Sequence, residues 1–158
     1  MIFVTVGTHH QPFERLLNAL GGLDGEDLVV QYGPGPRPPG VAVAEPFMPF
    51  DRMLECFRGA DKVITHAGVG SILCAVREGH TPLVVPRRHD LGEHVDDHQV
   101  ELTKALEARG NVVAVWETER LAQLLAEAPS RQPAAQAIEP ALCEPVREAL
   151  LGTQASAA

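Results

Sequence analysis

The chain has 158 residues, of which 45% are apolar and 22% are charged, and this size suits one globular domain with a single core. Its 13 basic and 21 acidic side chains give a formal net charge of −8 at pH 7, and no basic block occurs in the sequence. The electrostatic footprint of a nucleic-acid-binding protein is therefore missing, and we expect no nucleic-acid partner.

Hydropathy and cysteine usage indicate a cytoplasmic location. No apolar run approaches the roughly 18 residues of a membrane span, so we expect no transmembrane segment. The apolar start of the chain is followed at once by Gly7 and Thr8, without the basic region or cleavage site of a signal peptide. The three cysteines, Cys56, Cys74 and Cys143, are too widely spaced for a disulfide framework or a zinc knuckle.

Strand-like and helix-like patterns alternate along most of the chain. In chain order, we predict a strand at 2–6, a helix at 13–20, a strand at 28–32, a Gly- and Pro-rich loop at 33–40, a strand at 41–47, a helix at 51–58, a strand at 62–65, a helix at 70–78, a strand at 83–85, a helix at 96–109, a strand at 112–115 and a helix at 121–128. This alternation is typical of an α/β fold, a Rossmann-like parallel sheet with helices on both faces.

The domain is predicted to occupy residues 1–128. Four prolines punctuate the alanine-rich region that follows, so we expect a tail at 129–151 that is helical only at 141–151. Residues 152–158 are expected to be disordered.

Six of the seven histidines follow predicted strands. They are His9 and His10 after the first strand, His66 after residues 62–65, and His89, His94 and His98 after residues 83–85. Ligands of an open parallel sheet bind beyond the carboxyl ends of its strands. The distribution of histidines therefore predicts a functional crevice at that edge.

Two glycine-containing loops predict a phosphate or diphosphate site. Gly7 and Thr8 follow the first strand, and Gly68, Gly70 and Ser71 open a helix. Such loops let backbone N–H groups at a helix N-terminus approach an anion. The alternative is that the glycines only permit tight strand-to-helix turns, and that His66 only caps its loop.

Residues 86–99 form a polar segment with four carboxylates, three histidines, two arginines and a glutamine, a density that favours binding. Two alternatives remain for parts of it. His94 and His98, four residues apart, would share one face of a helix and could ligate a divalent metal with a nearby Asp90 or Asp97. Alternatively, Arg87 and Arg88 form a solvated pair that balances Asp90 and Glu93.

Four motifs resemble the C-terminal, nucleotide-sugar-binding half of family 28 glycosyltransferases. They are residues 4–16 (VTVGT…QPFxRL), 60–72 (ADxVITHAGxGSI), 82–87 (PLVVPR) and 94–99 (HVDDHQ), and the match runs from residue 1 to about 125. The resemblance implies a single lobe of the two-lobed GT-B architecture. More narrowly, the chain resembles stand-alone donor-binding subunits of two-chain glycosyltransferases, of the bacterial exopolysaccharide type and the eukaryotic dolichol-linked chitobiose type.

The resemblance also implies which residues hold the donor. They are Gly7 and Thr8 at the diphosphate, Phe47 and Met48 at the uracil, His66, Gly68, Gly70 and Ser71 on a second phosphate-side loop, and Asp97, His98 and Gln99 at the sugar hydroxyls. One position departs from the pattern. Cys74 stands three residues after Ser71, where relatives often carry an Asp or Glu for the ribose hydroxyls, and a thiol is a weak hydrogen-bonding partner. Two alternatives follow from this departure. Either Glu78 or backbone groups bind the ribose instead, or the nucleotide selectivity is altered.

The implied activity is inverting transfer of a hexose from a UDP-sugar to a lipid-linked acceptor, without metal or other cofactor. One lobe fills a chain of this size, so a membrane-associated partner subunit is expected to supply the acceptor lobe and the general base, with His9 or His10 assisting. The chain would then lie peripherally on the inner face of the membrane. The alternatives are a non-catalytic, regulatory nucleotide-binding module and, less favoured because it needs both lobes in one chain, a nucleotide-sugar epimerase.

Overall fold

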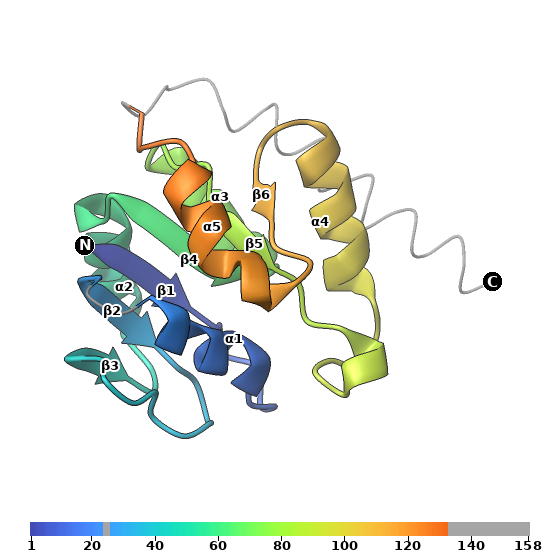
Figure 1. Cartoon of the computed structure of the whole chain (residues 1–158), viewed down its shortest axis with the longest axis horizontal. Coiled ribbons are helices and arrows are strands. Elements are labelled where there is room, and N and C mark those ends of the chain that lie inside the picture. Colours follow the sequence, from blue (N-terminus) through green and yellow to red (C-terminus); the bar gives the residue numbers. More distant parts are fainter. Residues whose placement is uncertain (24–25, 133–158) are drawn as a thin grey trace.

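The computed structural model describes residues 1–23 and 26–132, which form a six-stranded sheet flanked by helices (Figure 1). The strands are β1 Ile2–Thr5, β2 Leu28–Gln31, β3 Val43–Glu45, β4 Lys62–His66, β5 Leu83–Val85 and β6 Val113–Ala114. The helices are α1 Glu14–Ala19, α2 Phe50–Gly59, α3 Val69–Arg77, α4 His98–Ala108 and α5 Leu121–Glu127, with 3-10 turns η1 Leu20–Gly22, η2 His89–Leu91 and η3 Thr118–Arg120.

The strand order β3-β2-β1-β4-β5-β6 reverses the direction of chain progression between β1 and β4. All neighbouring strands are parallel, and Val4 of β1 is in register with Val30 of β2 and Ile64 of β4. The loops that follow β1 and β4 therefore diverge to opposite sides at this point. This topological switch point is the usual ligand-binding position of an open α/β sheet.

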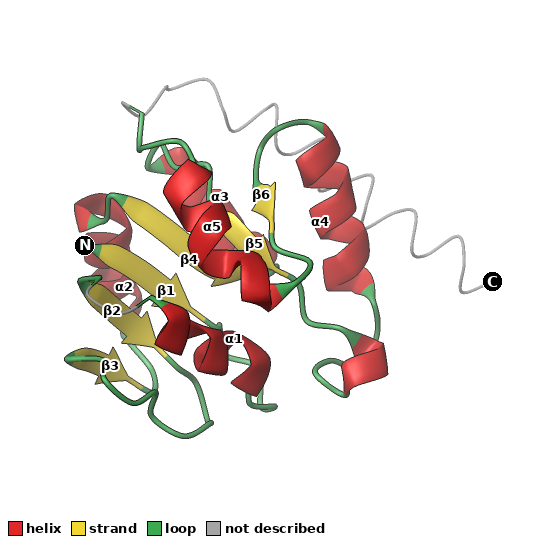
Figure 2. Cartoon of the chain, in the orientation of Figure 1, coloured by secondary structure: helices red, strands yellow, loops and turns green. Residues whose placement is uncertain are grey.

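Helices cover both faces of the sheet (Figure 2), and buried apolar side chains hold these layers together. Ile2 and Val4 of β1 pack in one buried cluster with residues of α1 and α5. Phe3 points the opposite way and meets Phe57 of α2 edge to face, with ring centroids 5.0 Å apart. The predicted Rossmann-like sheet with helices on both faces is thus confirmed.

The structure corrects several predicted boundaries. Strands β3 and β6 at the two edges are shorter than the predicted 41–47 and 112–115, because an edge strand pairs on one side only. Helix α4 begins at His98 instead of residue 96, because the Asp96 carboxylate accepts the His98 backbone N–H at 3.0 Å. The predicted helix at 141–151 and the predicted disorder at 152–158 lie outside the described residues.

Within residues 1–23 and 26–132, no helix has both the length and the apolar character needed to cross a bilayer.

Candidate nucleotide-binding site

A pocket of about 310 Å³ opens at the switch point between β1 and β4. Its lining comes from the loop after β1, from α2, and from the end of β4 together with the first turns of α3: Gly7, Thr8, Phe50, Met53, Phe57, His66, Gly68, Gly70, Ser71 and Cys74. The structure therefore brings together all the residues predicted for the phosphate side, from loops some 60 positions apart in the chain.

The residues predicted for the uracil do not line this pocket. Met48 is 9% exposed and belongs to the apolar cluster around Phe57, and Phe47 is half exposed. Phe50 and Met53 of α2 reach the pocket instead. Their spacing of three residues is helical and was the available signal, but the predicted helix started one residue too late to include Phe50.

Gly7 sits in a fixed and unusual backbone conformation. Its φ of +77° lies in the left-handed region that favours glycine. Its N–H donates to Thr5 Oγ1 at 3.2 Å, and its carbonyl oxygen accepts from Gln31 Nε2 at 3.0 Å. Because the Gly7 backbone is engaged inside the domain, the next residue, the exposed Thr8, is the one that offers polar groups to the pocket.

The imidazole of His66 is packed between the two glycine loops. A Cβ at Gly7 would lie 2.4 Å from His66 Nε2, and a Cβ at Gly68 would lie 2.1 Å from the same atom. Both glycines are therefore required by packing. Burial, with a smaller effect from the charge of Arg87, lowers the pKa of His66 from 6.5 to about 4, so the ring that lines the pocket is neutral at pH 7.

The N-terminus of α3 also faces this region of the pocket. Gly68 is the N-cap residue, and its carbonyl oxygen accepts the first helical N–H, from Ile72, at 3.0 Å. The N–H groups of Val69, Gly70 and Ser71 precede that bond, so no carbonyl of their own helix can accept from them. With the positive end of the helix dipole, they form a favourable environment for an anion.

In segment 86–99, the two adjacent arginines have different environments. Arg88 is partly exposed and pairs with Asp90 at 2.8 Å, as the solvated alternative predicted. Arg87 is 0% exposed, so for this residue the solvated alternative is wrong. Its guanidinium lies 4.5 Å from the ring centre of Phe13, and burial lowers its pKa to about 10, which leaves it charged at pH 7.

Arg87 joins the loop after β1 to segment 86–99. Its Nη2 donates to the carbonyl oxygen of Val6 at 3.1 Å, and its Nη1 donates to that of Gln11 at 3.0 Å and that of Glu93 at 3.3 Å. A second link is the two-pronged pair of Arg15 with the Glu93 carboxylate, at 2.8 and 2.9 Å. The two loops are thus held as one unit.

Gln99 has a structural role that the sequence did not reveal. Its Oε1 accepts from the backbone N–H of Ala67 at 3.2 Å and from that of Arg87 at 3.1 Å, which ties the loop after β4 to the loop after β5. Gln99 itself is 9% exposed, whereas Asp97 and His98 are exposed. None of these three predicted sugar-side residues lines the pocket.

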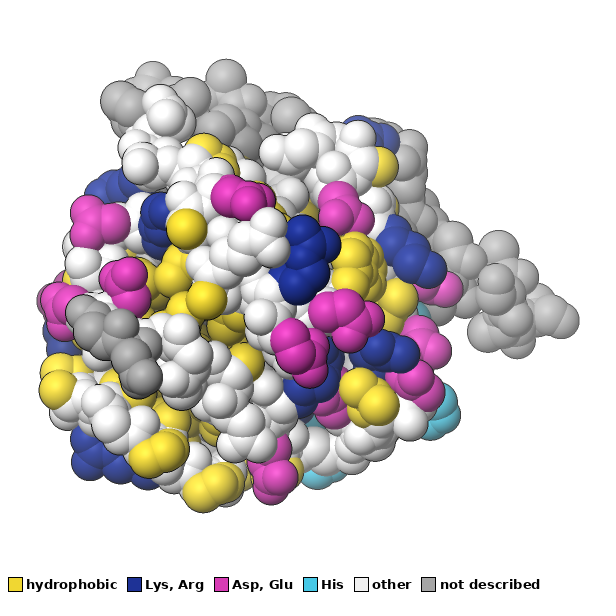
Figure 3. Space-filling model, in the orientation of Figure 1, with side chains coloured by type: hydrophobic (Ala, Val, Ile, Leu, Met, Phe, Trp, Pro, Cys, Tyr) yellow, Lys and Arg dark blue, Asp and Glu magenta, His cyan; other side chains and the backbone are white. Residues whose placement is uncertain are grey.

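The histidines near this edge interact with one another and with Asp96. The His9 ring lies 4.4 Å from that of His10 and 4.8 Å from that of His94, centre to centre. His94 Nδ1 and His98 Nδ1 lie 3.0 and 3.3 Å from the Asp96 carboxylate. On the face shown in Figure 3, histidine side chains lie along the lower edge, and acidic and basic side chains are interspersed.

This arrangement removes the basis of the metal alternative. His94 precedes α4, so His94 and His98 do not share a helix face as their spacing predicted. Within the described part of the chain, no group of three or more His, Cys, Asp or Glu residues could hold a metal ion.

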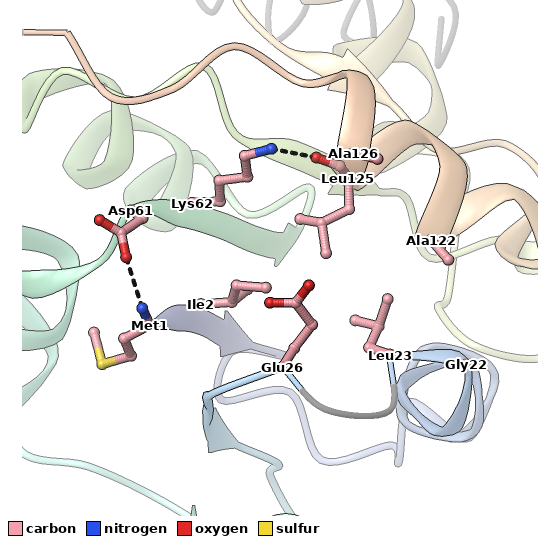
Figure 4. A pocket seen from close by; sticks show the side chains of 10 residues that line it. All are labelled: Met1, Ile2, Gly22, Leu23, Glu26, Asp61, Lys62, Ala122, Leu125 and Ala126. Atoms are coloured by element: carbon pink, nitrogen blue, oxygen red, sulfur yellow. Dashed lines mark hydrogen bonds and ion pairs between the residues drawn. The ribbon is translucent and has the colours of Figure 1, made fainter.

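A second hollow, of about 270 Å³, lies at the amino ends of the strands (Figure 4). Three of its charged groups are engaged: the Met1 ammonium contacts Asp61 at 2.6 Å, and Lys62 Nζ donates to the Leu125 carbonyl at 2.5 Å. This edge is opposite to the one where open α/β sheets bind ligands, so we place the functional site in the pocket at the switch point.

A parallel sheet in this order, with a glycine-lined pocket and a helix N-terminus at its switch point, defines a Rossmann-type nucleotide-binding domain. The model of the glycosyltransferase family 28 C-terminal domain matches residues 1–149, and the chain belongs to this family. The chain has the fold of a single GT-B lobe.

Two relatives carry the name UDP-N-acetylglucosamine transferase subunit ALG13. The chain is 32% identical to the Homo sapiens protein over 130 residues, which cover 70% of this chain and 10% of the human protein. It is 30% identical to the Yarrowia lipolytica protein over 135 residues, which cover 75% of this chain and 66% of that protein. The chain therefore spans less than two thirds of either relative.

Proposed function

We propose that this domain is the donor-binding and catalytic subunit of an inverting UDP-sugar hexosyltransferase. In the proposal it works as a heteromer with a membrane-associated subunit that supplies the acceptor lobe, and it glycosylates a lipid-linked acceptor in polysaccharide or glycan biosynthesis. The complex would lie on the cytoplasmic face of the membrane. Family membership and the names of the two relatives support the class of reaction and the two-subunit arrangement.

One observation carries the proposal: the pocket at the switch point combines two glycine loops with the first turn of α3. As the acceptor oxygen bonds to the anomeric carbon, the bond from that carbon to the diphosphate breaks and negative charge builds up on the departing diphosphate. The N–H groups of Val69, Gly70 and Ser71, with the hydroxyls of Ser71 and Thr8, are placed to stabilise that charge. The transfer is accordingly proposed to need no metal.

The acceptor hydroxyl must lose a proton as its oxygen bonds to the anomeric carbon. The Nε2 of His9 is 2.8 Å from Gln11 Oε1, so this nitrogen is occupied, and the His9 ring stacks on His94. His10 is exposed and more available. We assign the general base to the partner lobe, with His10 in an assisting role.

Calorimetry with UDP and UDP-N-acetylglucosamine tests donor binding. Half of a two-lobed site is expected to bind in the high-micromolar to millimolar range, roughly −4 to −6 kcal/mol. Gly70→Asp should abolish binding, because it places a carboxylate beside the diphosphate at an exposed position where a side chain meets no other atom. Gly22→Asp is the matched control, with open space in the hollow at the opposite edge, and should bind normally.

Transfer is tested by co-expression with a membrane-associated acceptor-lobe subunit. Activity should need both chains and should survive a chelator. Absence of nucleotide binding would refute the donor-site assignment, and robust turnover by the purified single chain would refute the two-subunit proposal. Binding without transfer in any complex would favour a regulatory module.

A further inference from the structure

Among residues 1–23 and 26–132, none that lines the pocket at the switch point carries a carboxylate. Its side chains are apolar or uncharged at pH 7, and its polar groups are two hydroxyls, the neutral ring of His66 and the thiol of Cys74. Nucleotide sites on Rossmann-type sheets commonly use an Asp or Glu to accept hydrogen bonds from the ribose hydroxyls. The lining of this pocket therefore lacks the acceptor that would make a ribose diol favourable.

Cys74 occupies the wall one helical turn beyond Gly70. It lies on α3 beside the apolar side chains of the pocket, and burial raises the pKa of its thiol above its ordinary value. The group is thus a protonated thiol at pH 7. A thiol is a weak donor and a weak acceptor, so it adds little hydrogen bonding to a diol.

Glu78, the residue that directly follows α3, already pairs with two arginines. Its carboxylate pairs with Arg58 at 3.3 Å and with Arg131 at 3.7 Å, and only 15% of the side chain is exposed. Arg131 also donates to the Glu78 carbonyl oxygen at 2.6 Å and to the carbonyl oxygen of Arg58. Turning this carboxylate to a ribose would break two ion pairs.

The acidic residues of α2 offer no substitute. Asp51 and Glu55 are exposed, neither lines the pocket, and Glu55 pairs with Arg52 at 3.5 Å on the helix surface. Phe50, Met53 and Phe57 are the residues that this helix directs to the pocket, and all three are apolar.

We propose that this site does not distinguish ribose from 2′-deoxyribose, and that its donors include 2′-deoxyribonucleoside diphosphate sugars. The proposal rests on the proposed function, since it concerns the same pocket. The hydroxyls of Thr8 and Ser71 are assigned to the diphosphate in the proposed function. Beside the thiol of Cys74 and the apolar side chains of α2, a 2′-hydroxyl then finds no strong acceptor, so its removal costs no affinity.

Paired calorimetric titrations of the full chain with UDP and with 2′-deoxy-UDP test the proposal. The two dissociation constants should agree within about threefold, whereas a hydrogen bond to a carboxylate would separate them by about 10- to 100-fold. Cys74→Glu should create that separation by improving UDP and leaving 2′-deoxy-UDP unimproved. Cys74→Ala is the size control and should keep the ratio near one.

Glu78→Gln tests whether the carboxylate of Glu78 accepts a hydrogen bond from the ribose. We expect the ratio of the two dissociation constants to stay near one, whatever the variant does to stability. A wild-type ratio above tenfold that falls in Glu78→Gln would overturn the proposal and assign the ribose to Glu78. A ratio near one in Cys74→Glu would also overturn it, because the diol would then lie away from α3. If neither nucleotide binds the wild-type chain, the proposed function itself fails.

Discussion

The pocket at the switch point and segment 86–99 lie at the same edge of the sheet but hold their polar groups differently. The pocket offers backbone N–H groups, hydroxyls and a neutral imidazole. Segment 86–99 concentrates charged side chains, and the most buried of them bond outside the segment, Arg87 to the loop after β1 and Glu93 to Arg15 of α1. We infer that the two regions have different roles. The pocket leaves its polar groups open to a ligand, and segment 86–99 holds the surrounding loops in place.

The largest effect should come from removing the buried charge of segment 86–99. Arg87→Met leaves the carbonyl oxygens of Val6 and Gln11 without their donor and should lower the free energy of unfolding by about 3 to 4 kcal/mol. Arg88→Met removes the neighbouring exposed pair and should cost about 0.5 kcal/mol or less. Urea denaturation measures both. Equal losses would mean that Arg87 does not hold the loops.

The neutral imidazole of His66 in the pocket makes the stability of the domain depend on pH. The pKa of His66 is about 4 in the folded domain and 6.5 when unperturbed, so between these values the unfolded chain binds a proton that the folded chain excludes. The contribution of His66 to the free energy of unfolding is therefore fully present above pH 6.5. It should decline by roughly 3 kcal/mol as the pH falls to 4. Burial also lowers the pKa of His80, which adds a loss of the same sign.

His66→Gln separates the two histidines. The variant removes one titrating group, so its loss of stability between pH 7 and pH 4 should be shallower than that of the wild type. Urea denaturation at each pH measures this loss. The slope that remains belongs to His80 and to the carboxylates Asp61, Asp90 and Asp96, whose pKa values are also lowered in the folded domain. Parallel curves for wild type and variant would show that the pKa of His66 is not lowered by folding.

Gln99 links the two regions, and its amide allows their roles to be separated. Gln99→Glu keeps the oxygen that accepts from Ala67 and Arg87 but replaces the NH₂ donor. If that donor meets a sugar hydroxyl, the variant should weaken UDP-sugar by roughly 5- to 100-fold and leave UDP unchanged. Gln99→Ala should weaken both ligands, because it also releases the two loops. Calorimetry that finds UDP-sugar unaffected in Gln99→Glu would remove Gln99 from sugar recognition.

The smallest effect concerns exposed apolar side chains on the two regions. Phe50 at the pocket is 65% exposed, and Val95 in segment 86–99 is 66% exposed. If Phe50 covers a bound base, Phe50→Ala should weaken UDP by about 3- to 10-fold, in line with the 1 kcal/mol or so of an exposed aromatic contact. Val95→Ala should leave UDP binding unchanged. The two variants having equal affinity would argue against a base beneath Phe50.

The fold and the meeting of the two glycine loops in one pocket were predictable because their signals are local. Alternating strand and helix patterns indicated the parallel sheet, and the two glycine loops are contiguous stretches that follow β1 and β4. The carboxyl ends of parallel strands meet at one edge, so these loops had to come together. Burial of Arg87 was not predictable, because its partners Val6 and Gln11 lie more than 70 positions earlier in the chain.

Helix boundaries account for the other differences. Spacing alone placed His94 and His98 on one helix face, but a hydrogen bond from the His98 N–H to Asp96 starts α4 at His98. A one-residue error at α2 hid Phe50 from the predicted pocket. Local hydrogen bonds and tertiary contacts set such boundaries, and hydrophobic periodicity does not report them.

The short edge strands have a consequence for how the domain can associate. Within the described sheet, the edge strands β3 and β6 have three and two residues, and the inner strands have four or five in β1, β2 and β4 and three in β5. Each edge thus presents only a few unpaired backbone groups to another chain. Strand addition would gain little there, so we expect the domain to resist amyloid-like stacking and to meet other proteins through its side chains.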